Sequence, residues 1–128
     1  ISLSMTTGDG LWVSHDAGAT WSVLADSTFL ATYAVSGLAI CRDFSNIMYA
    51  STTEFGIFKT ADNGQSWTAV NSGLPFPNTN ISAVAIAVHP TDPDRVYTSV
   101  AQTGGLDIFN LAPSHPGFFV STNGGTTW

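Results

Sequence analysis

Three segments of the chain repeat one pattern: GLWVSHDAGATW at residues 10–21, GIFKTADNGQSW at residues 56–67 and GFFVSTNGGTTW at residues 117–128. All three fit the order Gly, apolar, aromatic, any, Ser/Thr, any, Asp/Asn, any, Gly, any, Ser/Thr, Trp. Eight constrained positions that recur three times in 128 residues indicate a repeat architecture.

Each segment is predicted to form a β-hairpin. Its apolar and aromatic start has β-character, and the following Asp or Asn side chain can accept hydrogen bonds from the backbone N–H groups of a tight turn. The glycine supplies positive φ, and the tryptophan opens the next strand with a large surface for burial. A structural role therefore accounts for every constrained position. The predicted turn residues are Ser14, Asp16, Gly18, Trp21, Thr60, Asp62, Gly64, Trp67, Ser121, Asn123, Gly125 and Trp128.

The segment Ser/Thr-x-Asp-x-Gly-x-Ser/Thr-Trp resembles the Asp-box, or BNR repeat, of β-propellers. Such propellers include sialidases, sortilin-type receptors, xyloglucan-degrading glycoside hydrolases and photosystem assembly factors. The resemblance implies an all-β fold of four-stranded blades, with the box between the third and fourth strands and away from the usual active-site face. The third copy carries Asn123 in place of Asp, which leaves the turn plausible and weakens any chemical role. The resemblance is specific for fold and not for activity.

Alignment on the three box tryptophans predicts about ten strands in two and a half four-stranded antiparallel blades. Residues 1–29 form a partial blade (strands two to four), and residues 30–76 form a complete blade. Residues 77–128 form a partial blade (strands one to three) with an insertion at 101–116. Propellers close with about 4 to 8 blades, so uncovered faces and strand edges predict completion by further blades. These blades come from the same longer chain or from neighbouring subunits.

Composition excludes several function classes. The formal net charge is −6, with three Lys and Arg residues, and so few cations cannot neutralise a nucleic-acid backbone or an anionic lipid surface. No apolar run reaches the roughly 18 residues of a membrane-spanning helix, so membrane insertion is not expected. Charged residues make up only 9% of the chain, whereas serine and threonine are abundant. A polar, uncharged surface of this kind is common in secreted and cell-surface β-proteins.

The sequence contains no convincing catalytic pair. Glycoside hydrolysis needs two carboxylates about 5–10 Å apart, and the acidic residues outside the boxes form no evident pair. A sialidase would need a cluster of arginines, but only Arg42 and Arg95 are present, both in turns predicted on the box face. No nucleophile elbow, phosphate loop or metal-ligand triad occurs. We therefore predict no catalytic residue, metal or cofactor in this segment, and we leave enzymatic activity open.

Two functions fit these observations. The first is a non-catalytic propeller scaffold of a secreted or cell-surface protein, which binds a protein or glycan partner. Its predicted binding surface is the insertion-bearing face, the face that carries the loop 101–116 and lies opposite the box turns. The alternative is a slice of a secreted, xyloglucanase-like glycoside hydrolase whose catalytic residues lie outside these 128 residues. Loops on the insertion-bearing face carry aromatic side chains suited to stacking on sugars, together with an unrepeated carboxylate. The candidate binding residues are Asp107, Phe109, His115, Phe76 and Tyr33.

Overall fold

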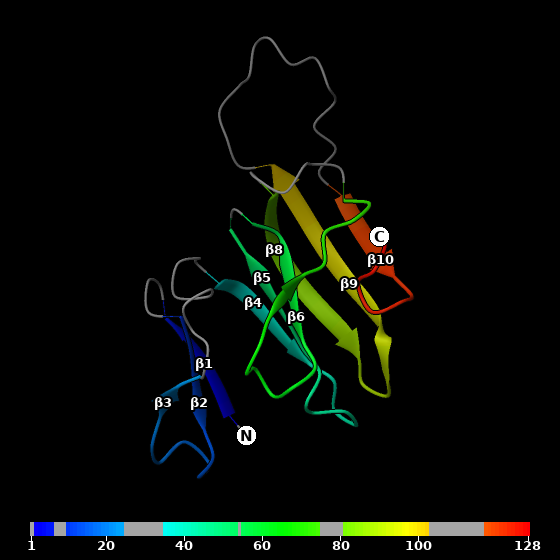
Figure 1. Ribbon diagram of the computed structural model, residues 1–128. Coiled ribbons are helices and arrows are strands. Elements are labelled where there is room, and N and C mark those ends of the chain that lie inside the picture. The colour runs from blue at the N-terminus through cyan, green and yellow to red at the C-terminus, as the bar shows by residue number, and fades with distance from the viewer. Residues whose placement is uncertain (1, 7–9, 25–34, 54, 75–80, 103–116) are drawn as a thin grey trace.

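The computed structural model describes residues 2–6, 10–24, 35–53, 55–74, 81–102 and 117–128. Within these ranges the chain forms ten strands and no helix, arranged in three antiparallel sheets that lie beside one another (Figure 1). The described residues include no helix that is long and apolar enough to span a membrane. The predicted fold class, an all-β propeller segment, is confirmed.

Strands that follow one another in the chain pair with one another in each sheet. The N-terminal sheet contains β1 (Ser2–Thr6), β2 (Gly10–Ser14) and β3 (Ser22–Val23). The middle sheet contains β4 (Val35–Ile40), β5 (Met48–Thr52), β6 (Ile57–Thr60) and β7 (Thr68–Ala69). The C-terminal sheet contains β8 (Ile81–His89), β9 (Asp92–Gln102) and β10 (Gly117–Ser121). A complete four-stranded blade thus lies between two three-stranded ones.

The strand β9 is longer than the sequence predicts. The sequence analysis predicts that Arg95 lies in a turn, but Arg95 belongs to the strand, because Asp92 already pairs with His89 and leaves only Pro90 and Thr91 in the turn. At its other end β9 runs to Gln102, so it includes the first two residues of the predicted insertion. Pairing with β8 extends β9 at both ends, and the local composition of the sequence does not indicate this pairing.

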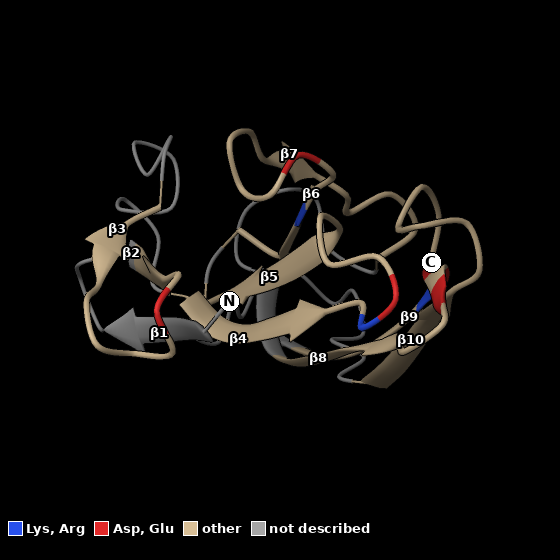
Figure 2. Cartoon of the chain, turned by 90° about the horizontal axis from the view of Figure 1, so that it is seen from below, with Lys and Arg blue, Asp and Glu red and all other residues tan. Residues whose placement is uncertain are grey.

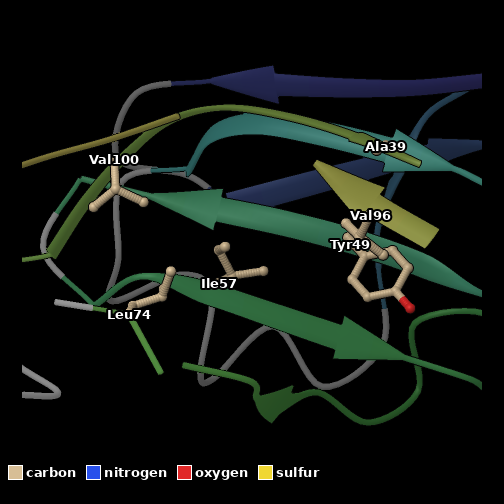
Figure 3. Packing of buried hydrophobic residues seen from close by; sticks show 6 residues of the cluster. All are labelled: Ala39, Tyr49, Ile57, Leu74, Val96 and Val100. Atoms are coloured by element: carbon tan, nitrogen blue, oxygen red, sulfur yellow. The ribbon is translucent and has the colours of Figure 1, made fainter. Parts of the chain in front are cut away.

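The middle blade is covered on both faces. Successive side chains of a strand point to opposite faces, so Ala50 packs toward the N-terminal sheet while Tyr49 packs toward the C-terminal sheet. On one side Phe58 joins Leu11 of β2, and on the other Ile57 joins Val96 of β9 (Figure 3). Every residue of β5 is buried as a result.

Tyr49 also makes a polar contact between blades. Its hydroxyl donates a hydrogen bond to the Pro93 carbonyl of the C-terminal sheet at 2.8 Å. The Lys59 ammonium lies 5.4 Å from the centre of the Tyr49 ring, within the range of a cation–π contact. Burial raises the pKa of Tyr49, so the hydroxyl keeps its proton and remains a donor at neutral pH. The two blades are thus joined by a directional bond as well as by apolar packing.

Truncation of a side chain between blades should destabilise the protein strongly. Ile57 is fully buried in the cluster shared by the middle and C-terminal sheets, so Ile57→Ala should lower the free energy of unfolding by about 2–5 kcal/mol. Phe44→Ala is the control, because Phe44 is 46% exposed and should change stability by about 0.5 kcal/mol or less. Denaturant unfolding measures both, and equal losses for the two variants would contradict the packing described.

Candidate functional site

The second box, at the turn after β6, is held by side-chain hydrogen bonds. The Thr60 hydroxyl donates to the Asp62 carboxylate at 2.7 Å and accepts the Gly64 N–H at 2.9 Å. The same carboxylate accepts the Ser66 N–H at 2.9 Å and the Ser66 hydroxyl at 2.5 Å. These bonds satisfy backbone groups that the turn removes from the strand ladder.

The first box repeats this arrangement. The Ser14 hydroxyl donates to Asp16 at 2.8 Å and accepts the Gly18 N–H at 2.7 Å. Asp16 in turn accepts the Thr20 N–H at 2.8 Å and the Thr20 hydroxyl at 2.5 Å. The first and second turns therefore form the same hydrogen bonds.

The third box achieves the same turn without a charge. The Asn123 carbonyl oxygen accepts the Ser121 hydroxyl and the Thr127 N–H, both at 2.9 Å. Its side-chain amide donates to the Thr127 hydroxyl at 2.9 Å, where a carboxylate would accept. A neutral amide performs the structural task of the acid, so the box needs an acceptor oxygen rather than a negative charge.

Each box turn contains two consecutive residues with positive φ. In the second box these are Asn63 (60°) and Gly64 (85°), and in the first they are Ala17 (59°) and Gly18 (93°). The sequence predicts the glycine but not its predecessor. Asparagine tolerates positive φ better than most residues, so Asn63 is compatible with a left-handed backbone already in the sequence. Ala17 gives no such indication.

Hydrogen bonding controls the protonation of the box acids. It lowers the pKa of Asp62 to about 2, with the bonds from Ser66 as the largest cause, and it lowers the pKa of Asp16 to about 2 through Thr20. Both acids are ionised at neutral pH, so neither holds a proton to donate as a general acid. The part of the chain that the structure describes also contains no cluster of three His, Cys, Asp or Glu residues that could hold a metal ion.

The box glycine receives a side chain from the preceding blade. A Cβ atom placed on Gly64 would overlap the Leu24 side chain, and one on Gly125 would lie 2.9 Å from Val70. Leu24 and Val70 occupy equivalent positions, because each directly follows the last strand of its blade. The Leu24 N–H donates to the Leu11 carbonyl, and the Val70 N–H donates to the Ile57 carbonyl, which is the second residue of the box segment in each case. The turn thus holds the glycine at the position where the aliphatic side chain of the preceding blade packs against it.

The box tryptophans use their indole N–H groups in two ways. Trp21 donates to the Gly18 carbonyl at 3.1 Å, and Trp67 donates to the Gly64 carbonyl at 3.2 Å, both within their own turns. Trp128 instead donates to the Val70 carbonyl of the preceding blade at 2.6 Å. The third box is therefore joined to its neighbour by this bond in addition to the glycine contact.

Apart from Lys59 in β6, the described charged residues lie in or near the turns at the box end of the sheets (Figure 2). Arg42 pairs with the adjacent Asp43 at 2.9 Å, and Arg95 lies 3.6 Å from Asp92 in its own strand. All four side chains are substantially exposed. Each arginine forms an ion pair with an acid of its own segment. This arrangement is typical of exposed surface ion pairs and differs from an arginine cluster that binds one substrate carboxylate.

Several described strand ends lie at the end of the sheets opposite the boxes. Val35 at the start of β4 pairs with Thr52, and Ile81 at the start of β8 pairs with Gln102, after which residues 103–116 follow. The strand starts and the Gln102 end therefore share one rim. The predicted binding residues belong to segments 25–34, 75–80 and 103–116 and lie outside the described residues: Tyr33, Phe76, Asp107, Phe109 and His115.

The corresponding connection in the middle blade is short. The Thr52 N–H donates to the Gly56 carbonyl at 2.8 Å, which closes a tight turn between β5 and β6. In the C-terminal blade, residues 103–116 stand between the equivalent strands. The connection between these two strands thus differs in length between the two blades, whereas the box turns share one hydrogen-bond pattern around the Ser/Thr hydroxyl and the Asp/Asn oxygen.

Asn71 is a structural residue that the sequence analysis missed. Its side-chain oxygen accepts the Ile57 N–H at 2.7 Å, and its amide donates to the Phe55 carbonyl at 2.9 Å. The side chain is buried against Gly56, where a Cβ atom would overlap it. Asn71 lies after the box tryptophan and outside the repeated pattern, so its role depends on contacts that only the folded blade reveals.

Comparison with known proteins bears on both family and fold. The family model described as "Sortilin, neurotensin receptor 3" (Sortilin-Vps10) matches residues 9–128. The vacuolar protein sorting/targeting protein 10 of Colletotrichum graminicola is 34% identical over 103 residues. That match covers 79% of this chain and 6% of the fungal protein, so the chain spans a small part of the length of this relative.

Two solved structures share the architecture. An ancestral GH74 enzyme superposes with a TM-score of 0.71 at 21% identity, over 98% of this chain and 16% of that one. The GH74 enzyme of Niastella koreensis superposes with a TM-score of 0.61 at 21% identity, over 97% of this chain and 18% of that one. At this level of identity the likeness shows the propeller fold and no activity.

Replacement of a box glycine should be costly. Gly64→Val should lower the free energy of unfolding by more than about 1 kcal/mol, because a β-branched side chain is strained at positive φ and would overlap Leu24. Gln65→Val introduces the same side chain at the exposed neighbouring position and serves as the control. Coincident denaturant melts of the two variants would refute the assigned turn.

The second box should make stability sensitive to acid. The pKa of Asp62 lies near 2 in the folded state against 3.8 ordinarily, so its stabilising contribution is present above pH 3.8 and is lost as the pH falls toward 2. Asp62→Asn should remove this part of the acid sensitivity and keep the fold, since Asn123 already serves the third box. Denaturant unfolding at pH 5, 4, 3 and 2 tests this. An equally steep loss of stability in both proteins would argue against the described role.

Proposed function

The chain belongs to the sortilin–Vps10 family, and on that premise we propose that it is a non-catalytic part of the propeller of a protein-sorting receptor. Its partner is a peptide or protein bound at the rim opposite the boxes. Two names support a sorting receptor. The family description names a neurotensin receptor, and the fungal relative is named a vacuolar protein sorting/targeting protein. A receptor of this kind places its propeller in an extracellular or lumenal compartment.

One observation carries the proposal: the two rims of the blades differ in kind. The box rim repeats one turn, in which the carboxylates of Asp16 and Asp62 are bonded within their own segments. The opposite rim changes from a tight turn in the middle blade to residues 103–116 in the C-terminal blade. Binding residues concentrate in variable connections carried by a rigid scaffold, which favours a partner site at the rim opposite the boxes.

The candidate residues fit a peptide partner. Phe76, Phe109 and Tyr33 offer aromatic surface, and Asp107 and His115 offer polar groups that could fix the orientation of a bound chain. All five belong to segments whose flanking strand ends share the rim opposite the boxes. A glycan is the other ligand class that these aromatic residues suit.

Replacement of residues 103–116 by a short Gly-Ser linker tests the proposal in the longest polypeptide that the parent gene encodes. Synthetic neurotensin, the peptide named in the family description, is the probe in titration calorimetry. We expect the linker variant to bind at least about tenfold more weakly, a loss of about 1.4 kcal/mol. The double variant Arg42→Ala with Asp43→Ala alters only the box rim, so it should bind normally.

Three results would count against the proposal. Equal affinity with and without residues 103–116 would place the partner elsewhere. Absence of peptide binding by the unaltered protein would remove the peptide as the ligand class. Release of reducing ends from xyloglucan by the unaltered protein would favour the glycoside hydrolase alternative.

A further inference from the structure

The chain contains two Asn-Gly steps, Asn63-Gly64 in the second box and Asn123-Gly124 in the third. An asparagine followed by glycine can lose its side-chain amide without an enzyme, because no side chain on the glycine shields the backbone nitrogen that attacks the amide carbon. The two steps occupy different positions of the turn. Asn63 lies between the acid and the glycine of its box, whereas Asn123 itself replaces the acid.

The Asn123-Gly124 step is held at both reacting groups. The Asn123 side chain accepts hydrogen bonds from the Ser121 hydroxyl and the Thr127 N–H and donates one to the Thr127 hydroxyl, each at 2.9 Å. The Gly124 N–H donates to the Asp94 carbonyl, also at 2.9 Å. The attacking nitrogen and the amide under attack are thus bonded to separate partners, and both sets of bonds must open before the two groups can meet.

The Asn63-Gly64 step is held at one reacting group only. The Gly64 N–H donates to the Thr60 hydroxyl at 2.9 Å. Asn63 is exposed, and within the described part of the chain no hydrogen bond engages its side-chain amide, while its backbone N–H donates to the Asn46 carbonyl. A local opening of the bond to Thr60 therefore frees the nitrogen, and local openings cost less free energy than unfolding of the whole protein.

We propose that Asn63 is a site of spontaneous deamidation and that the Thr60 hydroxyl restrains the reaction by holding the Gly64 N–H. In the opened turn the Gly64 nitrogen gives its proton to a solvent base and attacks the side-chain amide carbon of Asn63. The new nitrogen–carbon bond closes a succinimide ring, the bond from that carbon to the amide nitrogen breaks, and ammonia leaves with a proton returned by the solvent. Water then hydrolyses the ring at one of its two carbonyl groups and yields an aspartyl or an isoaspartyl residue.

Both products change the second box. The aspartyl product adds a carboxylate directly after Asp62, which is already ionised at neutral pH. The isoaspartyl product routes the backbone through the former side chain, so the main chain gains one carbon before Gly64. Gly64 has little space to shift toward the preceding blade, because even an added Cβ atom would overlap the Leu24 side chain. The isoaspartyl form should therefore loosen the contact between the N-terminal and middle sheets. This inference follows from the box turns and does not depend on peptide binding.

Incubation in heavy-oxygen water at mildly alkaline pH, followed by peptide mapping with mass spectrometry, tests the proposal on the longest polypeptide that the parent gene encodes. Incorporated heavy oxygen marks the deamidation that occurs during the incubation. In the folded protein we expect Asn63 to deamidate at least about tenfold faster than Asn123, because fewer hydrogen bonds must open. In denaturant the two residues should react at similar rates, since both precede glycine.

Two results would overturn the proposal. One is deamidation of Asn123 in the folded protein as fast as that of Asn63, or faster. The other is an Asn63 that stays intact in the folded protein for as long as the unfolded protein needs for complete conversion.

Thr60→Val tests the restraint, with Thr60→Ser as its matched control. Valine has the shape of threonine without the hydroxyl, so Asn63 should deamidate at least about tenfold faster than in the unaltered protein. Serine keeps the hydroxyl, as Ser14 does in the first box, and should leave the rate at Asn63 unchanged. Asn123 reports on unfolding in the same molecules. Acceleration confined to Asn63 supports the restraint, whereas equal acceleration at both residues, or none at Asn63, overturns it.

Discussion

The contact between a box glycine and the aliphatic side chain that ends the preceding blade sets the spacing of the blades. It occurs twice in the described structure, between Gly64 and Leu24 and between Gly125 and Val70. The glycine is held in place by its own turn, where the Thr60 hydroxyl binds both the Gly64 N–H and the Asp62 carboxylate. A single local motif thus determines both the course of the chain in a hairpin and the fit of the next blade.

The same constraint explains the composition of the chain. A blade that is covered on both faces has little room for charge, and all of β5 is buried accordingly. Serine and threonine supply the polar groups that the turns need at small volume, and Asn123 shows that no negative charge is required. Arg42 and Arg95 lie at the exposed box rim, where each pairs with an acid of its own segment, whereas Lys59 in β6 lies over the Tyr49 ring.

Much of the fold could be predicted because its determinants are local. The repeated pattern around Gly64 and Trp67 fixes a hairpin within twelve residues, and hydrophobic alternation identifies the flanking strands. Features that depend on distant partners could not be predicted. The buried role of Asn71, the early start of β9 at Asp92 and the Leu24 contact all arise from tertiary packing or strand pairing. The predicted binding residues remain hypotheses, since they belong to segments outside the described structure.

A double-mutant cycle between Leu24 and Gly64 tests the central claim most directly. Free energies of unfolding are measured for the unaltered protein, Leu24→Ala, Gly64→Ala and the double variant. If the glycine is required by the neighbouring blade, Gly64→Ala will cost less once Leu24 is shortened, with a coupling energy of about 1 kcal/mol or more. Costs that add to within about 0.5 kcal/mol would show that the glycine serves its own turn alone, and would contradict the account.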